Sequence, residues 1–203
     1  MIAVVDYGIG NLRSAQKALQ HLGADARLTS DPEEVRTAVG VVLPGVGAFG
    51  ACMNAMRASG LDTAVLEVLA ARRPFLGVCV GMQMLFDESE EAPGIAGLGV
   101  IPGVVRRLPD GLVLPHMGWN TVDVRPGSRL FEGLEPPTWL YFVHSYAPEP
   151  EDVGVVSATT EYGGDVVAAV EQDRLWATQF HPEKSGDAGL AVLANFVGAL
   201  AAA

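Results

Sequence analysis

Short apolar runs alternate with segments of helical periodicity through the first half of this chain, and that order restricts the fold more than any other feature. The apolar runs are bounded by turn residues and have the length of buried strands; they span residues 2–5, 26–29, 41–43 and 75–78. Helical patterns separate them over residues 12–22, from Asp31-Pro32 onward, and over residues 51–71 with an interruption near Ser59-Gly60. This alternation predicts an α/β fold in which helices flank a parallel sheet.

The second half of the chain has closely spaced strand candidates with turn residues between them. An acidic, glycine-rich stretch over residues 88–99 is predicted to be a surface loop. The strand candidates are residues 100–106, 112–114, 121–124, 139–144, 153–157, 166–170 and 175–180, and an apolar helix follows at 190–200. Their spacing favours antiparallel strands added to a central, mostly parallel sheet. We find no internal repeat or linker, so the prediction is a single domain over residues 1–203.

Composition and charge argue against several classes of protein. Hydrophobic residues make up 49% of the sequence and charged residues 18%, which indicates a compact globular chain. The formal net charge of -11 argues against binding to nucleic acid or to an anionic membrane. The first residues lack the pattern of a signal peptide, and no apolar stretch approaches the roughly 20 residues of a membrane span. We therefore expect a cytoplasmic protein with two reduced cysteines.

Cys79 lies between two glycines in Gly77-Val78-Cys79-Val80-Gly81, at the predicted change from strand to helix. This is the pattern of a nucleophile elbow, in which glycines remove side chains from a crowded turn. The N–H groups and the dipole at the start of the helix would favour the thiolate, the reactive form of cysteine. Taken alone, the motif fits a buried cysteine in a glycine-flanked turn equally well. Cys52 lies in a helical pattern without such glycines and is predicted to be structural.

His181 is the preferred candidate for the catalytic base. It follows the strand predicted at residues 175–180, and Pro182 is expected to prevent a helix from starting there. In an extended backbone, residues two apart project to the same side, so Glu183 is predicted to contact the imidazole and fix its tautomer. A strand end with exposed polar residues is the alternative. His144 is the runner-up base, because no acid stands two residues away from it.

The run Gly45-Val46-Gly47-Ala48-Phe49-Gly50 matches the pattern G-x-G-x-x-G and follows an apolar strand. Dinucleotide binding is a weak interpretation, because the acids nearest the required position, Asp62 and Glu67, fall in helical sequence. We favour a loop whose backbone N–H groups join that of Val80 in an oxyanion hole. A glycine turn without a chemical role remains the alternative.

Three of these motifs together resemble the signatures of the class I glutamine amidotransferases: residues 44–47, residues 77–83 and His181-Pro182-Glu183. Their order and spacing match along nearly the whole chain. Residues 6–11, 115–120 and 141–146, with Lys184-Ser185-Gly186, narrow the resemblance to the glutaminase subunits of imidazole glycerol phosphate synthase. Met82 stands where anthranilate and aminodeoxychorismate relatives usually carry histidine. The resemblance implies the single-domain class I glutamine amidotransferase fold.

The resemblance also implies a reaction and a role for each site residue. Cys79 would attack the side-chain amide of glutamine, His181 would protonate the departing ammonia, and Glu183 would orient His181. Water would then hydrolyse the glutamyl thioester. The implied oxyanion donors are Val46, Gly47 and Val80, and the residues implied to hold glutamine are Gly45, Gln83, Glu91, Ser145 and Tyr146. Threonine is more usual in the family where Ser145 stands. The resemblance implies no cofactor and no metal.

A partner subunit is implied as well. The ammonia would pass to a separate (β/α)8 cyclase subunit, which forms imidazole glycerol phosphate and an aminoimidazole carboxamide ribotide in histidine biosynthesis. This chain is too short to contain such a barrel. The residues at the implied heterodimer interface are Asn11, Trp119, Tyr141 and Lys184. Trp119 and Tyr141 would also suit an ordinary strand core, and Lys184 a solvated surface.

Three alternative functions remain open at this point. A glutaminase subunit of another synthase, such as one for pyridoxal phosphate or aminodeoxychorismate, is disfavoured by residues 115–120. A thiol peptidase or related hydrolase would use the same elbow. A non-catalytic partner protein is disfavoured because Cys79, His181 and Glu183 are all intact.

Overall fold

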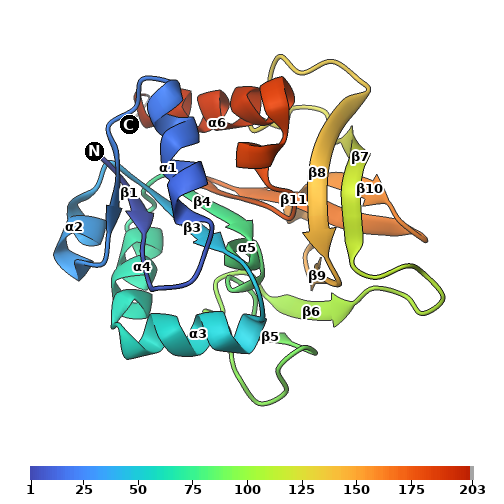
Figure 1. The fold of residues 1–203 in the computed structure, drawn as a ribbon, viewed down its shortest axis with the longest axis horizontal. Coiled ribbons are helices and arrows are strands. Elements are labelled where there is room, and N and C mark those ends of the chain that lie inside the picture. The colour runs from blue at the N-terminus through green and yellow to red at the C-terminus, as the bar shows by residue number, and fades with distance from the viewer. Residues whose placement is uncertain (202–203) are drawn as a thin grey trace.

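The computed structural model describes residues 1–201, and within them the strands form a large and a small sheet. The large sheet has nine strands in the order β2-β1-β3-β4-β12-β11-β10-β7-β8 (Figure 1). The strands from β2 to β12 in that order are parallel, and those from β12 to β8 alternate in direction. Their bounds are β1 Ile2–Val5, β2 Ala26–Thr29, β3 Gly40–Gly45, β4 Phe75–Cys79, β7 His116–Val124, β8 Thr138–His144, β10 Val156–Glu161, β11 Asp165–Gln172 and β12 Leu175–Thr178.

Helices cover both faces of the parallel half of the sheet. Helices α1 and α6 lie together on one side, and α2, α3 and α4 lie on the other (Figure 1). Their bounds are α1 Leu12–His21, α2 Pro32–Thr37, α3 Phe49–Ala58, α4 Leu61–Ala70 and α6 Gly186–Ala201. None of the helices described in residues 1–201 combines the length and the apolar character that a bilayer crossing requires.

The parallel half confirms the sequence predictions closely, because its elements depend on local signals. Asp31 caps α2, since its side chain accepts a hydrogen bond from the Glu33 backbone N–H at 2.8 Å. The helical pattern at residues 51–71 divides at Gly60, whose φ of +71° is a left-handed conformation that glycine adopts without strain. The predicted α/β alternation therefore gives the predicted parallel sheet.

Two predictions for the second half were wrong. Residues 112–114 form a loop in which Val113 is 81% exposed, so this apolar run does not mark a buried strand. Residues 153–157 divide into a 3₁₀ turn, Val153–Val155, and the start of β10. The predicted surface loop at residues 88–99 is present, although its first two residues form the short strand β5, Glu88–Ser89, in which Ser89 is buried.

One strand was missed because it contains two prolines. Strand β9, Tyr146–Pro150, pairs antiparallel with β6, Gly103–Arg107, and β5 joins the other edge of β6. Proline cannot donate a hydrogen bond to a neighbouring strand, but an edge strand needs donors on one side alone. Strand β9 lies at the edge of the small sheet, which explains how it accommodates Pro148 and Pro150.

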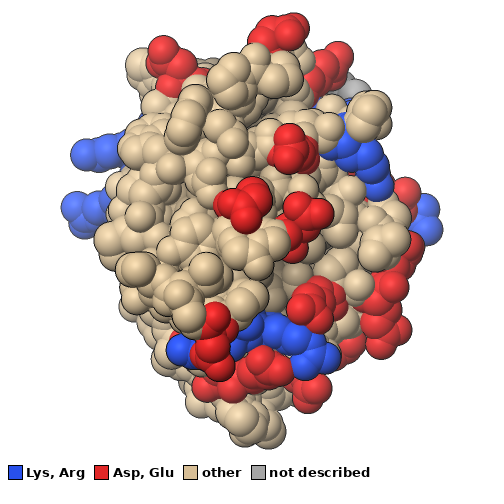
Figure 2. Space-filling view, turned by 90° about the vertical axis from the view of Figure 1, so that its right-hand side faces the viewer, with Lys and Arg blue, Asp and Glu red and all other residues tan. Residues whose placement is uncertain are grey.

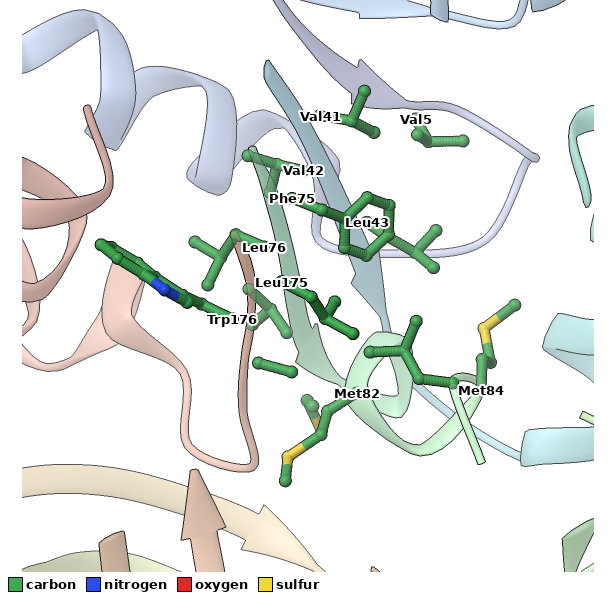
Figure 3. Close-up of a cluster of buried hydrophobic side chains, with 14 of the residues drawn as sticks. Val5, Val41, Val42, Leu43, Phe75, Leu76, Met82, Met84, Leu175 and Trp176 are labelled. Atoms are coloured by element: carbon green, nitrogen blue, oxygen red, sulfur yellow. The ribbon is translucent and has the colours of Figure 1, made fainter. Parts of the chain in front are cut away.

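The main core lies around the central parallel strands. Valine, leucine and aromatic side chains from β3, β4 and β12 pack together, and Met82 and Met84 reach the same cluster from the segment after β4 (Figure 3). Phe75, Leu76 and Met82 have no measurable exposure. Burial of a side chain of this size contributes about 1.5–3 kcal/mol to stability. The strand that ends at Cys79 is therefore held in place by its packing in the main core.

Candidate active site

Cys79 is the last residue of β4 and directly precedes the one-turn helix α5, Val80–Gln83. Its backbone has φ 55° and ψ −115°, a conformation that is costly for a residue with a side chain. Such strain is typical of a nucleophile elbow and lifts the side chain out of the sheet. The predicted strand–cysteine–helix turn is confirmed. The helix is a single turn, so its dipole is summed over few peptide units.

Glycines make this turn sterically feasible. A Cβ atom on Gly81 would lie 1.9 Å from the Leu43 carbonyl oxygen, and one on Gly45 would lie 2.6 Å from the Gly81 nitrogen. A Cβ atom on Gly77 would lie 2.9 Å from the Gly81 carbonyl oxygen. Strands β3 and β4 and helix α5 therefore meet backbone against backbone, as the glycines around Cys79 predicted.

His181 and Glu183 form a buried pair beside the elbow. His181 Nδ1 lies 2.8 Å from Glu183 Oε1, and the two side chains are 2% and 4% exposed. The predicted contact is thus present, but its predicted backbone is wrong. A 3₁₀ turn, Pro182–Lys184, begins directly after His181, because proline is well tolerated in the first turn of a helix. This turn, rather than an extended strand, brings the carboxylate to the imidazole.

The electrostatic environment favours a protonated His181. Burial lowers the pKa of this imidazole, but the Cys79 sulfur and the Glu183 carboxylate oppose burial more strongly and raise the pKa to about 9. The Glu183 contact is the one with hydrogen-bond geometry. Within residues 1–201, His181 Nε2 has no hydrogen-bond partner, so the Cys79 sulfur acts on it as a nearby charge. Nε2 is therefore the nitrogen available for proton transfer.

A cavity of about 590 Å³ opens at this point, within the size range of small-molecule sites. Its walls bring together segments from the two halves of the chain, and it is lined by Gly10, Asn11, Val46, Gly47, Cys79, Val80, Gln83, Glu91, Pro115, Val143, His144, Ser145, Tyr146, His181 and Lys184. Most of the residues assigned to the site from the sequence are in this set. Glu183 lies behind His181 and does not line the cavity.

The residues implied to hold a substrate divide into two groups. Gln83, Glu91 and Tyr146 line the cavity, as does Ser145. Glu91 has one oxygen engaged already, because Oε2 accepts a hydrogen bond of 2.7 Å from the Phe49 backbone N–H at the start of α3. Gly45 is not among the lining residues; its lack of a side chain serves the contact with helix α5.

The predicted oxyanion loop forms part of the cavity wall. Val46, Gly47 and Val80 all line it, and Gly47 has a φ of +83°. Two residues hold this loop by hydrogen bonds, and the sequence predictions gave neither of them this role. Tyr7 donates its hydroxyl to the Pro44 carbonyl at 2.8 Å, and Cys52 donates its thiol to the Val46 carbonyl at 3.3 Å. Both residues are buried, and burial raises the pKa of each.

His144, the runner-up base, is held in a different network. Its Nδ1 lies 3.0 Å from the Tyr146 carbonyl and its Nε2 lies 3.1 Å from His116 Nδ1. The carbonyl can only accept, so His144 carries its proton on Nδ1 and accepts from His116 through Nε2. Burial lowers the pKa of His144 to about 4. With both nitrogens engaged and the ring neutral, His144 is not the base.

This buried histidine predicts a pH-dependent loss of stability. Because the folded-state pKa of His144 is about 4 and the ordinary value is 6.5, the unfolded chain binds the extra proton first as pH falls. The contribution of neutral His144 to the free energy of unfolding is complete above pH 6.5. It decreases toward pH 4, by on the order of 3 kcal/mol. His144→Asn keeps a donor for the Tyr146 carbonyl and should weaken this pH dependence of the unfolding free energy, measured with urea.

The exposed His21→Asn substitution is the control for loss of a histidine. If His144→Asn and wild type lose the same free energy of unfolding between pH 6.5 and pH 4, burial of neutral His144 is not the cause.

The four residues implied at an interface lie near the cavity mouth. Asn11 and Lys184 line the cavity, and Lys184 Nζ lies 5.9 Å from the centre of the Tyr141 ring. Trp119 and Tyr141 are cross-strand neighbours on β7 and β8, with ring centres 6.1 Å apart. Trp119 is 52% exposed, so it is not part of the core.

An exposed apolar surface continues from these residues along β7 and β8. We call it the hairpin face: Met117, Trp119, Trp139, Tyr141 and Val143, which alternate along the two strands and therefore project to the same side. Met117 is 62% exposed and Trp139 is 52% exposed. The side of the molecule that carries β7 and β8 has a broad area without charged side chains, with acidic and basic residues at its edges (Figure 2). Val143 connects this face to the cavity.

Comparison with known proteins places the chain in a family. The model of the family "Glutamine amidotransferase class-I" matches residues 3–199. Imidazole glycerol phosphate synthase subunit HisH of Methanothermobacter thermautotrophicus is 52% identical over 197 residues, with 97% of this chain and 98% of that protein covered. The subunit of the same name from Syntrophotalea carbinolica is 49% identical over 203 residues, with 97% and 98% covered.

Solved structures agree on the fold. PurLQS from Thermotoga maritima matches with a TM-score of 0.77 at 16% identity over 98% of each chain. A glutamine amidotransferase crystal structure matches with a TM-score of 0.73 at 24% identity, covering 95% of this chain and 98% of that one. The predicted fold class is therefore confirmed. The chain belongs to the class I glutamine amidotransferases and, within them, to the family of imidazole glycerol phosphate synthase subunit HisH.

Proposed function

We propose that this protein hydrolyses the side-chain amide of glutamine to glutamate and ammonia through a thioester on Cys79. The observation that carries the proposal is the meeting of a strained cysteine and a buried His181–Glu183 pair at one cavity. Family membership supports the same chemistry. Gln83, Glu91, Ser145 and Tyr146 supply polar groups that suit the charged α-amino and α-carboxyl groups of an amino acid.

The reaction divides into two steps that share one proton carrier. The Cys79 thiolate attacks the amide carbon, and His181 transfers its Nε2 proton to the departing nitrogen, which leaves as ammonia. Neutral His181 then takes a proton from water, and the water oxygen attacks the thioester carbon. The C–S bond breaks, glutamate leaves and releases its new carboxyl proton to solvent, and the thiolate and protonated His181 are restored. Glu183 holds Nδ1 throughout, so Nε2 alone exchanges protons.

The oxyanion that develops on the substrate requires hydrogen-bond donors beside Cys79. Backbone N–H groups of Val46, Gly47 and Val80 lie in the cavity wall, where they suit such a role. The loop at residues 45–47 joins strand β3, which is buried, to helix α3. Tyr7 holds the Pro44 carbonyl and Cys52 holds the Val46 carbonyl, so the loop is anchored at both of these residues.

The ammonia is proposed to serve a separate (β/α)8 cyclase subunit in a heterodimer. Relatives that match along almost their whole length carry the name of a synthase subunit. The hairpin face supports an interface, because aromatic residues are enriched where proteins bind each other. Its connection to the cavity through Val143 and Lys184 would let ammonia pass without release to solvent. The cyclase would then form imidazole glycerol phosphate in histidine biosynthesis.

Two further proposals concern the whole chain. We propose a single domain over residues 1–203, supported by one buried cluster that includes residues from Ile2 to Phe196. We also propose a cytoplasmic location, supported by the free, buried state of Cys52 and Cys79.

A glutaminase assay with and without the cyclase tests the proposed function. We expect weak release of glutamate by this protein alone and a large increase when the cyclase carries its nucleotide substrate. Copurification provides the second measurement. Binding to an aminodeoxychorismate synthase subunit in place of the cyclase would assign the glutaminase to another synthase, and hydrolysis of peptides in preference to glutamine would indicate a thiol peptidase.

Replacement of Glu183 by glutamine should lower kcat for glutamine hydrolysis about 100-fold, because a neutral amide does not stabilise protonated His181. The pKa of His181 should fall from about 9 toward its ordinary value of 6.5. Proton transfer to the departing nitrogen requires the protonated imidazole, so the basic limb of the profile of kcat/KM against pH should move to lower pH.

Glu149→Gln is the matched control, since it removes an exposed carboxylate that pairs with Arg106 far from the reaction. An unchanged basic limb in Glu183→Gln would contradict the role given to this carboxylate.

A further inference from the structure

Gln179 is a buried polar side chain that the proposed reaction does not use, yet its amide points at the nucleophile. Its Nε2 lies 3.7 Å from Cys79 Sγ, in hydrogen-bond geometry for sulfur. The residue is completely buried and is absent from the lining of the cavity. It follows β12, the strand parallel to β4, and its backbone N–H donates to the Ala168 carbonyl at 2.8 Å. Gln179 therefore reaches the sulfur from inside the protein, opposite to the substrate.

The polarity of this amide is determined by its neighbours. Gln83 Nε2 lies 3.0 Å from the Tyr146 carbonyl and 3.1 Å from Gln179 Oε1. A backbone carbonyl can only accept, so Gln83 must turn its NH₂ group toward Tyr146. The same NH₂ group then donates to Gln179, which must present its oxygen. The Gln179 NH₂ group is left facing Cys79. A flip of Gln83 would set its oxygen against the Tyr146 and Gln179 oxygens, and a flip of Gln179 would set two NH₂ groups against each other.

The Tyr146 carbonyl is itself held in place. It also accepts from His144 Nδ1 at 3.0 Å, so both of its lone pairs are occupied. His144 is supported in turn by His116, whose ring stacks between Phe142 and Tyr162 with centres 4.9 Å and 4.0 Å away. The two histidines thus have a structural role: they hold the acceptor that orients the two glutamines.

We propose that Gln179 is a positioning residue that donates a hydrogen bond from Nε2 to the Cys79 sulfur, with a polarity imposed by the Tyr146 carbonyl through Gln83. A hydrogen bond donated by a neutral amide to an anionic sulfur is charge-assisted, whereas an oxygen at the same place would repel the thiolate. The bond favours the reactive form of Cys79 and holds Sγ toward the cavity. The inference takes from the proposed function the identity of Cys79 as the nucleophile.

The test measures the alkylation rate of Cys79 by iodoacetamide at neutral pH, with peptide mapping by mass spectrometry. Gln179→Met keeps nearly the same length and removes the donor, and Gln179→Glu keeps the shape and places a carboxylate oxygen against the sulfur. Cys52 in the same molecule is the internal reference, because it is completely buried and reports any opening of the fold. Gln20→Met, on the exposed side of α1, removes an amide that bonds only the Ala26 carbonyl among the described residues.

Gln179→Met should slow alkylation of Cys79 about tenfold, the change that corresponds to the loss of one hydrogen bond to a charged group. Gln179→Glu should slow it further, and Gln20→Met should leave it unchanged. A loosened fold would act in the opposite direction, because it would speed alkylation of both cysteines. A rate for Cys79 in Gln179→Met that equals or exceeds the wild-type rate therefore overturns the proposal, whether or not the variant is destabilised.

Steady-state kinetics separates this inference from the proposed function. Gln179→Met should lower kcat for glutamine hydrolysis about tenfold and change KM by less than about twofold, because Gln179 does not line the cavity. A raised KM with unchanged kcat would overturn the positioning role. Slower alkylation in a protein that does not hydrolyse glutamine would support the inference while the proposed function failed.

Discussion

Cys79→Ala should abolish glutamine-dependent synthesis by the complex with the cyclase, while synthesis from added ammonium salt continues at the wild-type rate. The expected loss of glutaminase activity is roughly 10⁴-fold or more, the scale found when the nucleophile of a catalytic triad is removed. Without sulfur no thioester forms, and His181 and Glu183 have no covalent intermediate to act upon. The ammonium-dependent reaction takes place in the partner and requires no group on Cys79. Both rates are measured on the assembled complex.

Cys52→Ser is the matched control, because it removes the other thiol of the sequence and keeps a donor for the Val46 carbonyl. It should retain most of the glutaminase activity. If Cys79→Ala also stopped the ammonium-dependent reaction, Cys79 would have a structural role or a role in the partner's site, and the division of labour proposed here would be wrong.

Gly81→Ala should destabilise the protein by about 3 kcal/mol or more, a severe effect for a single methyl group. The new Cβ atom would lie 1.9 Å from the Leu43 carbonyl oxygen, which belongs to the central strand β3 and has no room to retreat. Either β3 and α5 separate or the elbow at Cys79 changes its backbone. Denaturation with urea measures the free energy of unfolding, and the glutaminase activity should fall in parallel.

Gly198→Ala introduces the same side chain, but we expect the opposite effect on stability. Gly198 lies within α6, and a Cβ built on it would meet no heavy atom of the described residues within 4 Å beyond its chain neighbours and the backbone of its own helix. Alanine should therefore stabilise the helix by about 0.5–1 kcal/mol. If Gly81→Ala changed the free energy of unfolding by no more than Gly198→Ala does, close packing at the elbow would not be the reason for its glycine.

The structure agrees with the sequence predictions where a few adjacent residues decide the local conformation. The cap at Asp31, the break at Gly60 and the elbow at Cys79 each depend on the conformations allowed to one or two residues. The predictions were wrong where pairing with a neighbouring strand decides whether a segment is a strand. Residues 112–114 are as apolar as a strand but find no neighbour, whereas β9 contains two prolines and pairs through its permitted edge.

The same distinction between local and long-range determinants applies to the active site. The amino-acid sequence by itself determined the parallel α/β half, the thiol at its elbow and the pairing of His181 with a carboxylate two residues away, because these depend on local geometry. Only the tertiary structure decided that His144 is engaged elsewhere and that Gln179 presents its NH₂ group to Cys79. His144 is held by the nearby Tyr146 carbonyl and by His116, which is 28 residues away, and Gln179 contacts partners 96 and 100 residues distant in the chain. No local pattern specifies such a partner, since the packing of both halves around one cavity brings it into contact.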